Sequence, residues 1–426
     1  MFKTIKSNFV RLWASGAIHI VFGSFATKFV AFFGSIFVVR FLTKSDYGIL
    51  SYIENIYGYA FIFAGYGMIN AILRFIIIAP ANKKKTYYHR IIRNSICFDT
   101  LLAIVLITAN MFISYPKEFA QASQLMPILA LLIPFQNLVN ILLTYLRAIF
   151  KNKLYAYGSC SVSVLLIIGR IIGALVSGVT GVVFSRLILN ILLSLIGLIL
   201  VARFFVHEYG NEPLTKSEKR EMDKYAIQYM LTNGLWALFM LNDTFLLAQF
   251  VGSSNVLADY KVAYVLPGNI SIFATAIGTY IGPQFTKNEK NIAWVKANFK
   301  KTLLISSGVM LSVCLIITMF SNPIIKLMYG EQYLNVIPLM ELLLVAAFLN
   351  SAIRYTIANI LGAIGKISNN LVVSIFGMVL QIVLDCLLIP NYGAYGAAVA
   401  SIIVYLSMSI MLLIVFRKVT TSPSHL

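Results

Sequence analysis

Twelve stretches of mainly apolar residues, separated by short polar interruptions, run along the whole chain. They lie near residues 15–40, 48–72, 91–114, 125–146, 154–177, 180–205, 225–250, 256–283, 301–320, 335–361, 367–389 and 393–416. An α-helix needs about 20 residues to cross the hydrocarbon core of a bilayer, and each stretch approaches or exceeds that length. The pattern predicts an all-α membrane protein with about 12 transmembrane helices.

A mixed polar segment at residues 206–224 divides the predicted helices into two groups of six. Gly210 and Pro213 interrupt regular structure there, and Thr215 precedes Glu218 with the spacing of a capping box, which predicts a short surface helix. We therefore expect an N-terminal six-helix lobe at residues 1–205, a cytoplasmic linker at 206–224 and a C-terminal six-helix lobe at 225–426.

Two short sequence matches indicate that the lobes are repeats of each other. The segment LRAIFK at 146–151 resembles LGAIGK at 361–366, and the pair Asp46-Tyr47 recurs as Asp259-Tyr260. Both matches are separated by close to half of the chain, as parallel internal repeats require. The sequence thus favours two pseudo-symmetric lobes with a substrate path between them.

The composition supports a membrane location. Hydrophobic residues make up 59% of the 426 residues and charged residues only 12%, against about 25% charged residues in soluble domains. The net charge of +19 would suggest nucleic acid in a soluble protein, but here the basic residues gather in alternate connections, while the opposite connections carry only Lys44, Lys117 and Lys326. By the positive-inside rule both termini lie in the cytoplasm, and no nucleic-acid partner is expected.

The N-terminus carries Lys3, Lys6 and Arg11 before its first apolar run, and no small-residue cleavage site follows. We expect this helix to be retained as an anchor.

The sequence contains no enzymatic signature. It has no phosphate-cradling glycine loop, no zinc-ligand spacing and no nucleophile elbow. The four cysteines, Cys97, Cys160, Cys314 and Cys386, lie in apolar stretches without a metal or redox spacing. Neither catalysis nor a bound cofactor or metal is expected.

Charged residues inside the predicted spans are the candidate site residues, because a charge at membrane depth costs about 2.5–3.5 kcal/mol on insertion scales and therefore faces protein or water. Arg170 and Arg186 lie at similar distances on either side of a predicted helix connection. Two guanidinium groups at matched depth suit a phosphate or pyrophosphate. The alternative is an ordinary ion pair with Glu54, which lies at similar depth.

Two further basic residues are candidates for the same anion cavity. Lys28 lies near the middle of the first span, where it either lines a hydrated cavity or forms a buried structural pair. Arg354 lies in the inner half of its span, where it either contacts an entering anion or extends to the cytoplasmic surface.

Acidic residues of the second lobe correspond to basic residues of the first. The separation that relates Leu146 to Leu361 carries Arg170 onto Asp385 and Lys28 onto Asp243. This asymmetry suggests that the first lobe holds an anionic substrate while an acid, Asp243 or Asp385, binds a coupling proton or sodium ion. Glu54 is a third ion-coupling candidate, and structural pairing of these acids is an equal alternative.

Four stretches carry a family resemblance: FLTKSDYG at 41–48, YLRA through KLYA at 145–156, residues 243–260, and LIPNYGAYGAA at 388–398. With them the chain resembles the polysaccharide-transporter branch of the multidrug/oligosaccharidyl-lipid/polysaccharide flippase superfamily, most closely the O-antigen repeat-unit flippases.

The resemblance implies a V-shaped, MATE-like bundle of two lobes with a cationic central cavity. It implies a flippase that moves an undecaprenyl-pyrophosphate-linked oligosaccharide from the cytoplasmic to the periplasmic leaflet of the bacterial inner membrane by alternating access. The expected partners are this lipid-linked substrate, membrane lipids and, if transport is coupled, H+ or Na+.

Three other functions compete with this one. A cation-coupled multidrug exporter of the same superfamily would favour an acidic or aromatic cavity, which the basic spans argue against. A membrane-embedded polysaccharide polymerase would need a large outer loop, and the predicted outer loops are short. Flippases of lipid-linked peptidoglycan precursors typically carry two more helices than this chain predicts.

Overall fold

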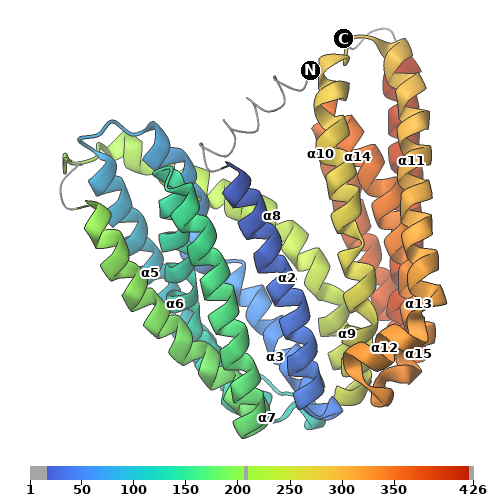
Figure 1. The fold of residues 1–426 in the computed structure, drawn as a ribbon, viewed down its shortest axis with the longest axis horizontal. Helices are drawn as coiled ribbons and strands as arrows, with labels where there is room; N and C mark the ends of the chain where they lie inside the picture. Colours follow the sequence, from blue (N-terminus) through green and yellow to red (C-terminus); the bar gives the residue numbers. More distant parts are fainter. Residues whose placement is uncertain (1–16, 206–209, 422–426) are drawn as a thin grey trace. The chain divides into compact units, whose positions relative to one another are not determined.

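The computed structural model describes residues 17–205 and 210–421, and every regular element within these ranges is helical (Figure 1). The predicted all-α architecture is confirmed. The basic residues Lys3, Lys6 and Arg11 and the first residues of the predicted linker lie outside the described residues.

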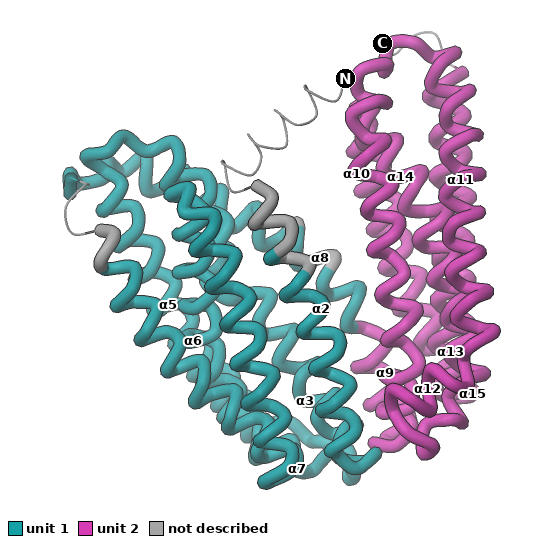
Figure 2. Tube along the Cα trace, viewed as in Figure 1, with its two compact units in different colours: residues 1–241 teal, residues 242–426 magenta. Residues whose placement is uncertain are grey.

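The chain divides into two compact units, residues 1–241 and 242–426 (Figure 2). The first unit contains α2 (Ala17–Phe41), α3 (Lys44–Phe61), η1 (Ala64–Gly67), α4 (Met68–Ala71), η2 (Ile72–Ile76), α5 (Lys84–Asn110), η3 (Lys117–Phe119), α6 (Ala122–Ala148), α7 (Asn152–Phe205) and most of α8 (Lys216–Val251). The second contains the end of α8, then α9 (Ser254–Asn269), α10 (Ser271–Lys287), α11 (Ile292–Met319), α12 (Ser321–Tyr329), η4 (Glu331–Val336), α13 (Ile337–Phe348), η5 (Leu349–Arg354), α14 (Tyr355–Ala363) and α15 (Ile367–Thr421).

The division between the units falls within α8, later than the predicted linker. The first turns of α8 pack into the core of the first unit, where Met222 and Ala226 are fully buried with Met68 and Ile72. Burying this apolar face ties the start of α8 to the first unit, since removal of apolar area from water is the main source of packing stability.

Two long helices are hairpins. In α7 the backbone leaves the helical region at Ser177 and Gly178, where φ of Gly178 is +56°. A Cβ added to Gly173 would clash with the carbonyl oxygen of Gly181, so the two arms pack backbone against backbone. In α15 the break is at Gly393. Both reversals lie where the sequence predicted a connection between spans.

Apolar side chains cover much of the outside of these helices. Ile172, Leu175 and Val176 on α7 are 55%, 60% and 76% exposed. Within residues 17–205 and 210–421, seven helices are long and apolar enough to cross a membrane, or eight if Lys44–Phe61 and Ala64–Ile76, bent by 46°, form one crossing. Because α7 and α15 each reverse, they supply two segments apiece, and helices in the described ranges occupy all twelve predicted spans. The surface is suited to lipid.

One local prediction needs correction. Thr215 and Glu218 do form a capping box, with the Thr215 amide donating to Glu218 Oε2 at 2.8 Å and the Glu218 amide donating to Thr215 Oγ1 at 3.3 Å. It does not begin a separate surface helix, because α8 continues without interruption from Lys216 to Val251. A cap satisfies the first free amides of a helix but sets no limit on where that helix ends.

Candidate functional site

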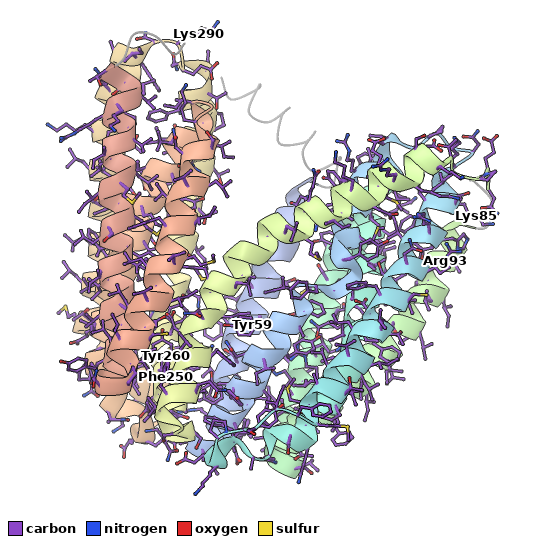
Figure 3. The ribbon with its side chains drawn as sticks, turned by 180° about the vertical axis from the view of Figure 1, so that it is seen from behind. Tyr59, Lys85, Arg93, Phe250, Tyr260 and Lys290 are labelled. Atoms are coloured by element: carbon purple, nitrogen blue, oxygen red, sulfur yellow. The ribbon has the colours of Figure 1, made fainter. Side chains whose placement is uncertain are left out.

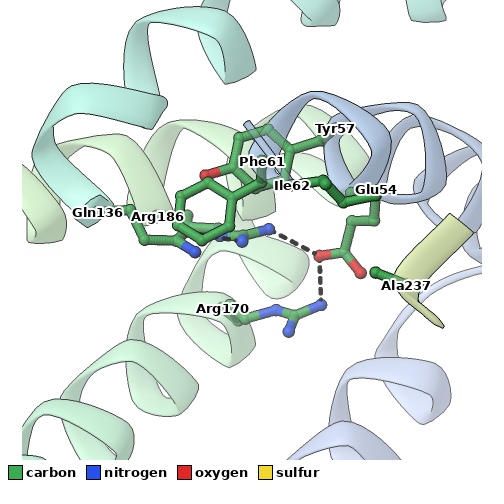
Figure 4. A pocket seen from close by; sticks show the side chains of 9 residues that line it. Glu54, Tyr57, Phe61, Ile62, Gln136, Arg170, Arg186 and Ala237 are labelled. Carbon is green, nitrogen blue, oxygen red and sulfur yellow. Dashed lines mark hydrogen bonds and ion pairs between the residues drawn. The ribbon is translucent and has the colours of Figure 1, made fainter. Parts of the chain in front are cut away.

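The hairpin of α7 brings Arg170 and Arg186 to the same carboxylate. Nη2 of Arg170 lies 2.8 Å from Oε1 of Glu54, and Nη1 of Arg186 lies 3.2 Å from the same oxygen (Figure 4). Arg170 lies before the break at Ser177 and Gly178, and Arg186 follows it, so the two arms present both groups at one level. Glu54 comes from α3.

Two residues that the sequence analysis did not select hold Arg186 in place. Its Nη2 donates to Oε1 of Gln136 on α6 at 2.8 Å, and its guanidinium carbon lies 4.8 Å from the ring centroid of Tyr57. A cation over an aromatic face is favourable. Tyr57 follows Glu54 by three residues, a spacing that puts both on one face of α3 and could have identified it.

These side chains line an open pocket of about 470 Å³ in the first unit. Its lining residues are Glu54, Tyr57, Gly58, Phe61, Ile62, Gln136, Arg170, Arg186 and Ala237 (Figure 4). The side chains of Arg170, Arg186 and Glu54 are 23%, 18% and 31% exposed, so all three remain accessible from the pocket.

The charges in the pocket are unequal. One carboxylate faces two guanidinium groups, which leaves an excess of one positive charge when all three are ionised. In addition, Nε of Arg170 is a buried donor without a hydrogen-bond partner among the described residues. The predicted ion pair with Glu54 is therefore present, yet it leaves one positive charge in excess for an anion.

The other two predicted cations are not part of this pocket. Lys28 is exposed on α2 and does not line it. Arg354 belongs to the second unit, where its Nε donates to Oδ1 of Asn350 at 2.6 Å. With 8% of its surface exposed, Arg354 is buried rather than extended toward solvent.

Asp243 and Asp385 both belong to the second unit and interact with each other there. Asp243 accepts a hydrogen bond of 2.9 Å from the hydroxyl of Tyr260, which Figure 3 labels. Asp385 is fully buried and accepts hydrogen bonds of 3.0 Å from both Asn242 and Gln381. The two carboxyls thus lie close together in one hydrogen-bonded cluster, in which Asn242 next to Asp243 donates to Asp385.

A further buried acid, Asp99 on α5, is absent from the sequence-based candidates. Its oxygens accept hydrogen bonds of 2.6 Å from the Gly65 amide and from Nδ2 of Asn137. Asp99 has no exposed surface. It lies inside the predicted span 91–114, so the rule that charges within apolar spans have a role would have found it.

In the described part of the chain, no group of three or more His, Cys, Asp or Glu side chains is placed to hold a metal ion.

Comparisons with known proteins agree with this architecture. A family model described as polysaccharide biosynthesis protein matches residues 37–338. A Shigella flexneri protein provisionally named an O-antigen transporter is 24% identical over 383 residues, covering 85% of this chain and 88% of that protein. An uncharacterized membrane protein of Methanocaldococcus jannaschii is 26% identical over 237 residues, covering 53% of this chain and 45% of that protein.

Solved structures share the fold. The lipid II flippase MurJ in an inward closed conformation has a TM-score of 0.73 at 17% identity, covering 94% of this chain and 87% of MurJ. An inward-facing multidrug resistance MATE family transporter of the MOP superfamily has a TM-score of 0.65 at 17% identity, covering 93% of this chain and 94% of that one. The predicted resemblance and fold class are confirmed: the chain is a multi-pass membrane protein with a transporter fold, not an enzyme, and it belongs to the polysaccharide biosynthesis protein family.

Proposed function

We propose that this protein is a flippase for undecaprenyl-pyrophosphate-linked oligosaccharides, such as O-antigen repeat units. It moves them from the cytoplasmic to the periplasmic leaflet of the bacterial inner membrane by alternating access, and both of its termini lie in the cytoplasm. The family, the name of the Shigella flexneri relative and the fold shared with MurJ support this assignment.

The observation that carries the proposal is the paired guanidinium groups of Arg170 and Arg186 in an open pocket. A pyrophosphate that enters hydrocarbon unaided meets an idealised cost of order 20 kcal/mol per ion. Planar guanidinium groups offset this cost, because they offer phosphate oxygens paired, charge-assisted hydrogen bonds. The polyprenyl tail needs no such help and remains in lipid.

Glu54 holds the two arginines together while no substrate is bound. Both guanidinium groups converge on one oxygen of this carboxylate, so an arriving pyrophosphate competes with Glu54 for the same donors. This competition keeps the cations arranged for a pyrophosphate while limiting how tightly it is held, and a carrier must also release its cargo.

Ion coupling is a second element of the proposal. The neighbouring carboxyls of Asp243 and Asp385 are the site at which a coupling proton or sodium ion binds during transport. Coupling is not obligatory for the transport direction, because an inside-negative potential already favours outward movement of negative charge by about 2.3 kcal/mol per charge per 100 mV.

The test is leaflet crossing in vesicles. The purified protein is reconstituted with a fluorescent lipid-linked oligosaccharide, and the rate at which the glycan becomes accessible to an impermeant reagent is measured. Loss of one charged hydrogen bond is worth about 1.5–3 kcal/mol, so Arg170→Gln and Arg186→Gln should each slow crossing by roughly tenfold or more. Lys290→Gln, an exposed cation between α10 and α11 (Figure 3), is the matched control.

The cation-coupled drug exporter remains the competing function, and the same variants distinguish the two. The excess positive charge in the pocket repels an organic cation. If the protein is a drug exporter, Arg170→Gln should therefore raise the rate at which it transports such a cation. If lipid-linked oligosaccharide crosses equally fast with wild-type protein, Arg170→Gln and protein-free vesicles, the flippase assignment is wrong.

A further inference from the structure

A second pocket adjoins the arginine pocket in the first unit. It has a volume of about 160 Å³ and shares three lining residues, Phe61, Ile62 and Ala237, with the pocket of Arg170 and Arg186. A ligand anchored at the arginines therefore lies directly beside this second pocket.

The lining of the second pocket is chemically distinct. Four amide side chains converge on it from three elements: Asn70 on α4, Asn137 and Asn140 on α6, and Asn233 on α8. Tyr229 on α8 adds an aromatic ring that is 40% exposed. None of the described residues that line it carries a charge.

The amides are available to a ligand. Hydrogen bonds within the described residues do not engage the side chains of Asn70, Asn140 or Asn233. Asn137 differs, because its Nδ2 donates to Asp99 at 2.6 Å, an interaction that fixes the orientation of its amide. Three uncommitted amides and one fixed amide thus surround a small space.

Uncharged amides beside an aromatic ring suit a sugar rather than a phosphate. Each amide offers two donors and an acceptor, which matches hydroxyl groups that both donate and accept. The apolar face of a sugar ring packs on an aromatic side chain, whereas a phosphate prefers cationic donors. The volume equals that of roughly five water molecules in the liquid, which is suited to one ring rather than a chain.

We propose that this amide pocket holds the first sugar of the oligosaccharide, the ring bonded directly to the pyrophosphate. The inference rests on the proposed function, because it takes the arginine pocket as the pyrophosphate site. It assigns a separate role to each pocket: the arginines bind the pyrophosphate that all such lipids share, and the amide pocket selects lipids that carry a sugar.

The experiment compares two probes on the purified full-length chain in lipid nanodiscs: undecaprenyl pyrophosphate alone, and the same lipid bearing one N-acetylhexosamine. The wild-type protein should bind the sugar-bearing lipid about tenfold more tightly. Asn140→Ala and Asn233→Ala should each reduce this preference by about three- to tenfold, while binding of the bare lipid stays within about twofold. Asn391→Ala, an exposed amide on α15, is the control and should keep the full preference.

The outcomes separate this inference from the proposed function. If the wild-type protein binds both lipids equally, or if both variants keep the preference, the sugar assignment is overturned while the pyrophosphate site stands. If neither lipid binds, both proposals are overturned together. Tyr229→Leu provides a second test that removes no amide, and it should also lower the preference without affecting the bare lipid.

Discussion

The backbone amide of Gly65 donates a hydrogen bond of 2.6 Å to the buried carboxylate of Asp99. Gly65 lies at the break between α3 and α4, where Gly65, Tyr66 and Gly67 have φ values of +56°, +37° and +85°. Helix ends leave amides without partners, and in a membrane water does not replace them. Asp99 thus satisfies a donor that the break would otherwise leave exposed to an apolar environment.

Replacement of Asp99 should destabilise the first unit. Asp99→Ala leaves the Gly65 amide and Nδ2 of Asn137 without their acceptor, at a cost of about 1–3 kcal/mol for each buried donor. Asp99→Asn retains one acceptor oxygen and should cost roughly half as much. Thermal unfolding in detergent measures both, with the exposed Glu331→Gln as the control. Equal unfolding temperatures for wild type and Asp99→Ala would show that the carboxylate does not hold the break.

The break that Asp99 stabilises could not be predicted from the sequence, whereas the geometry of the arginine pocket partly could. The hairpin turn at Gly178 and the convergence of Arg170 and Arg186 follow from one-dimensional information: a break in an apolar run and equal distances from it. The Gly65 break lies inside an uninterrupted apolar stretch. Its stability depends on Asp99 and Asn137, which are distant along the chain, so periodicity alone could not place it.

The position of Lys28 relative to the arginine pocket could not be predicted from the sequence either. The sequence analysis selected Lys28 by its depth along the first span, but depth does not determine which side of the helix faces a pocket. In the structure it is exposed on α2, away from the lining of the arginine pocket. Gln136 was missed because uncharged polar residues are common in such spans and give no signal until their partners are known. The only sequence signal for Tyr57 is its three-residue spacing from Glu54.

Removal of the Glu54 charge should strengthen anion binding. Glu54 occupies donors of both arginines, so Glu54→Gln frees their charge for a ligand. At partly exposed sites one ion pair is worth up to about 1 kcal/mol, which corresponds to roughly two- to fivefold tighter binding of inorganic pyrophosphate. Isothermal titration at low salt measures this, and the gain should shrink as salt screens the charges.

Glu289→Gln, which removes an acid in the connection before α11, is the matched control for Glu54→Gln. It should leave pyrophosphate affinity unchanged. Weaker binding in Glu54→Gln than in wild type would mean that the carboxylate is needed to position the arginines and does not compete with the ligand.

Low pH should weaken the ion pair between Lys83, which precedes α5, and Glu218 on α8. The Lys83 ammonium lies 2.8 Å from Oε1 of Glu218, and this hydrogen bond, together with the Thr215 amide, lowers the pKa of Glu218 from 4.5 to about 2. A lowered carboxyl pKa stabilises the folded state fully above the unfolded value, and this stability is lost as the pH falls through the folded value. The window therefore runs from about pH 5 down to about pH 2.

The measurement is the difference in unfolding temperature between wild type and Glu218→Gln across this range. The difference should be constant from pH 7 to about pH 5 and should shrink toward zero near pH 2. A difference that is the same at pH 7 and at pH 3 would rule out the ion pair as its source. Glu289→Gln, whose acid makes no ion pair among the described residues, should show no such trend.

The paired acids of the second unit should make transport sensitive to ion gradients. Asp243 accepts a hydrogen bond from Tyr260, and Asp385 accepts one from Gln381. Asn at both acid positions can neither titrate nor supply a charge to sodium. In vesicles, a gradient of one pH unit can change accumulation by up to about tenfold for each coupled proton. Wild-type accumulation of lipid-linked oligosaccharide should respond to an imposed proton or sodium gradient, whereas the double variant Asp243→Asn with Asp385→Asn should not.

Asp259→Asn serves as the control for this double variant, because Asp259 lies on α9 and accepts a hydrogen bond from Asn335 instead. If the double variant transports at the wild-type rate with the same gradient dependence, the acids are structural, and the membrane potential alone must supply the direction of transport.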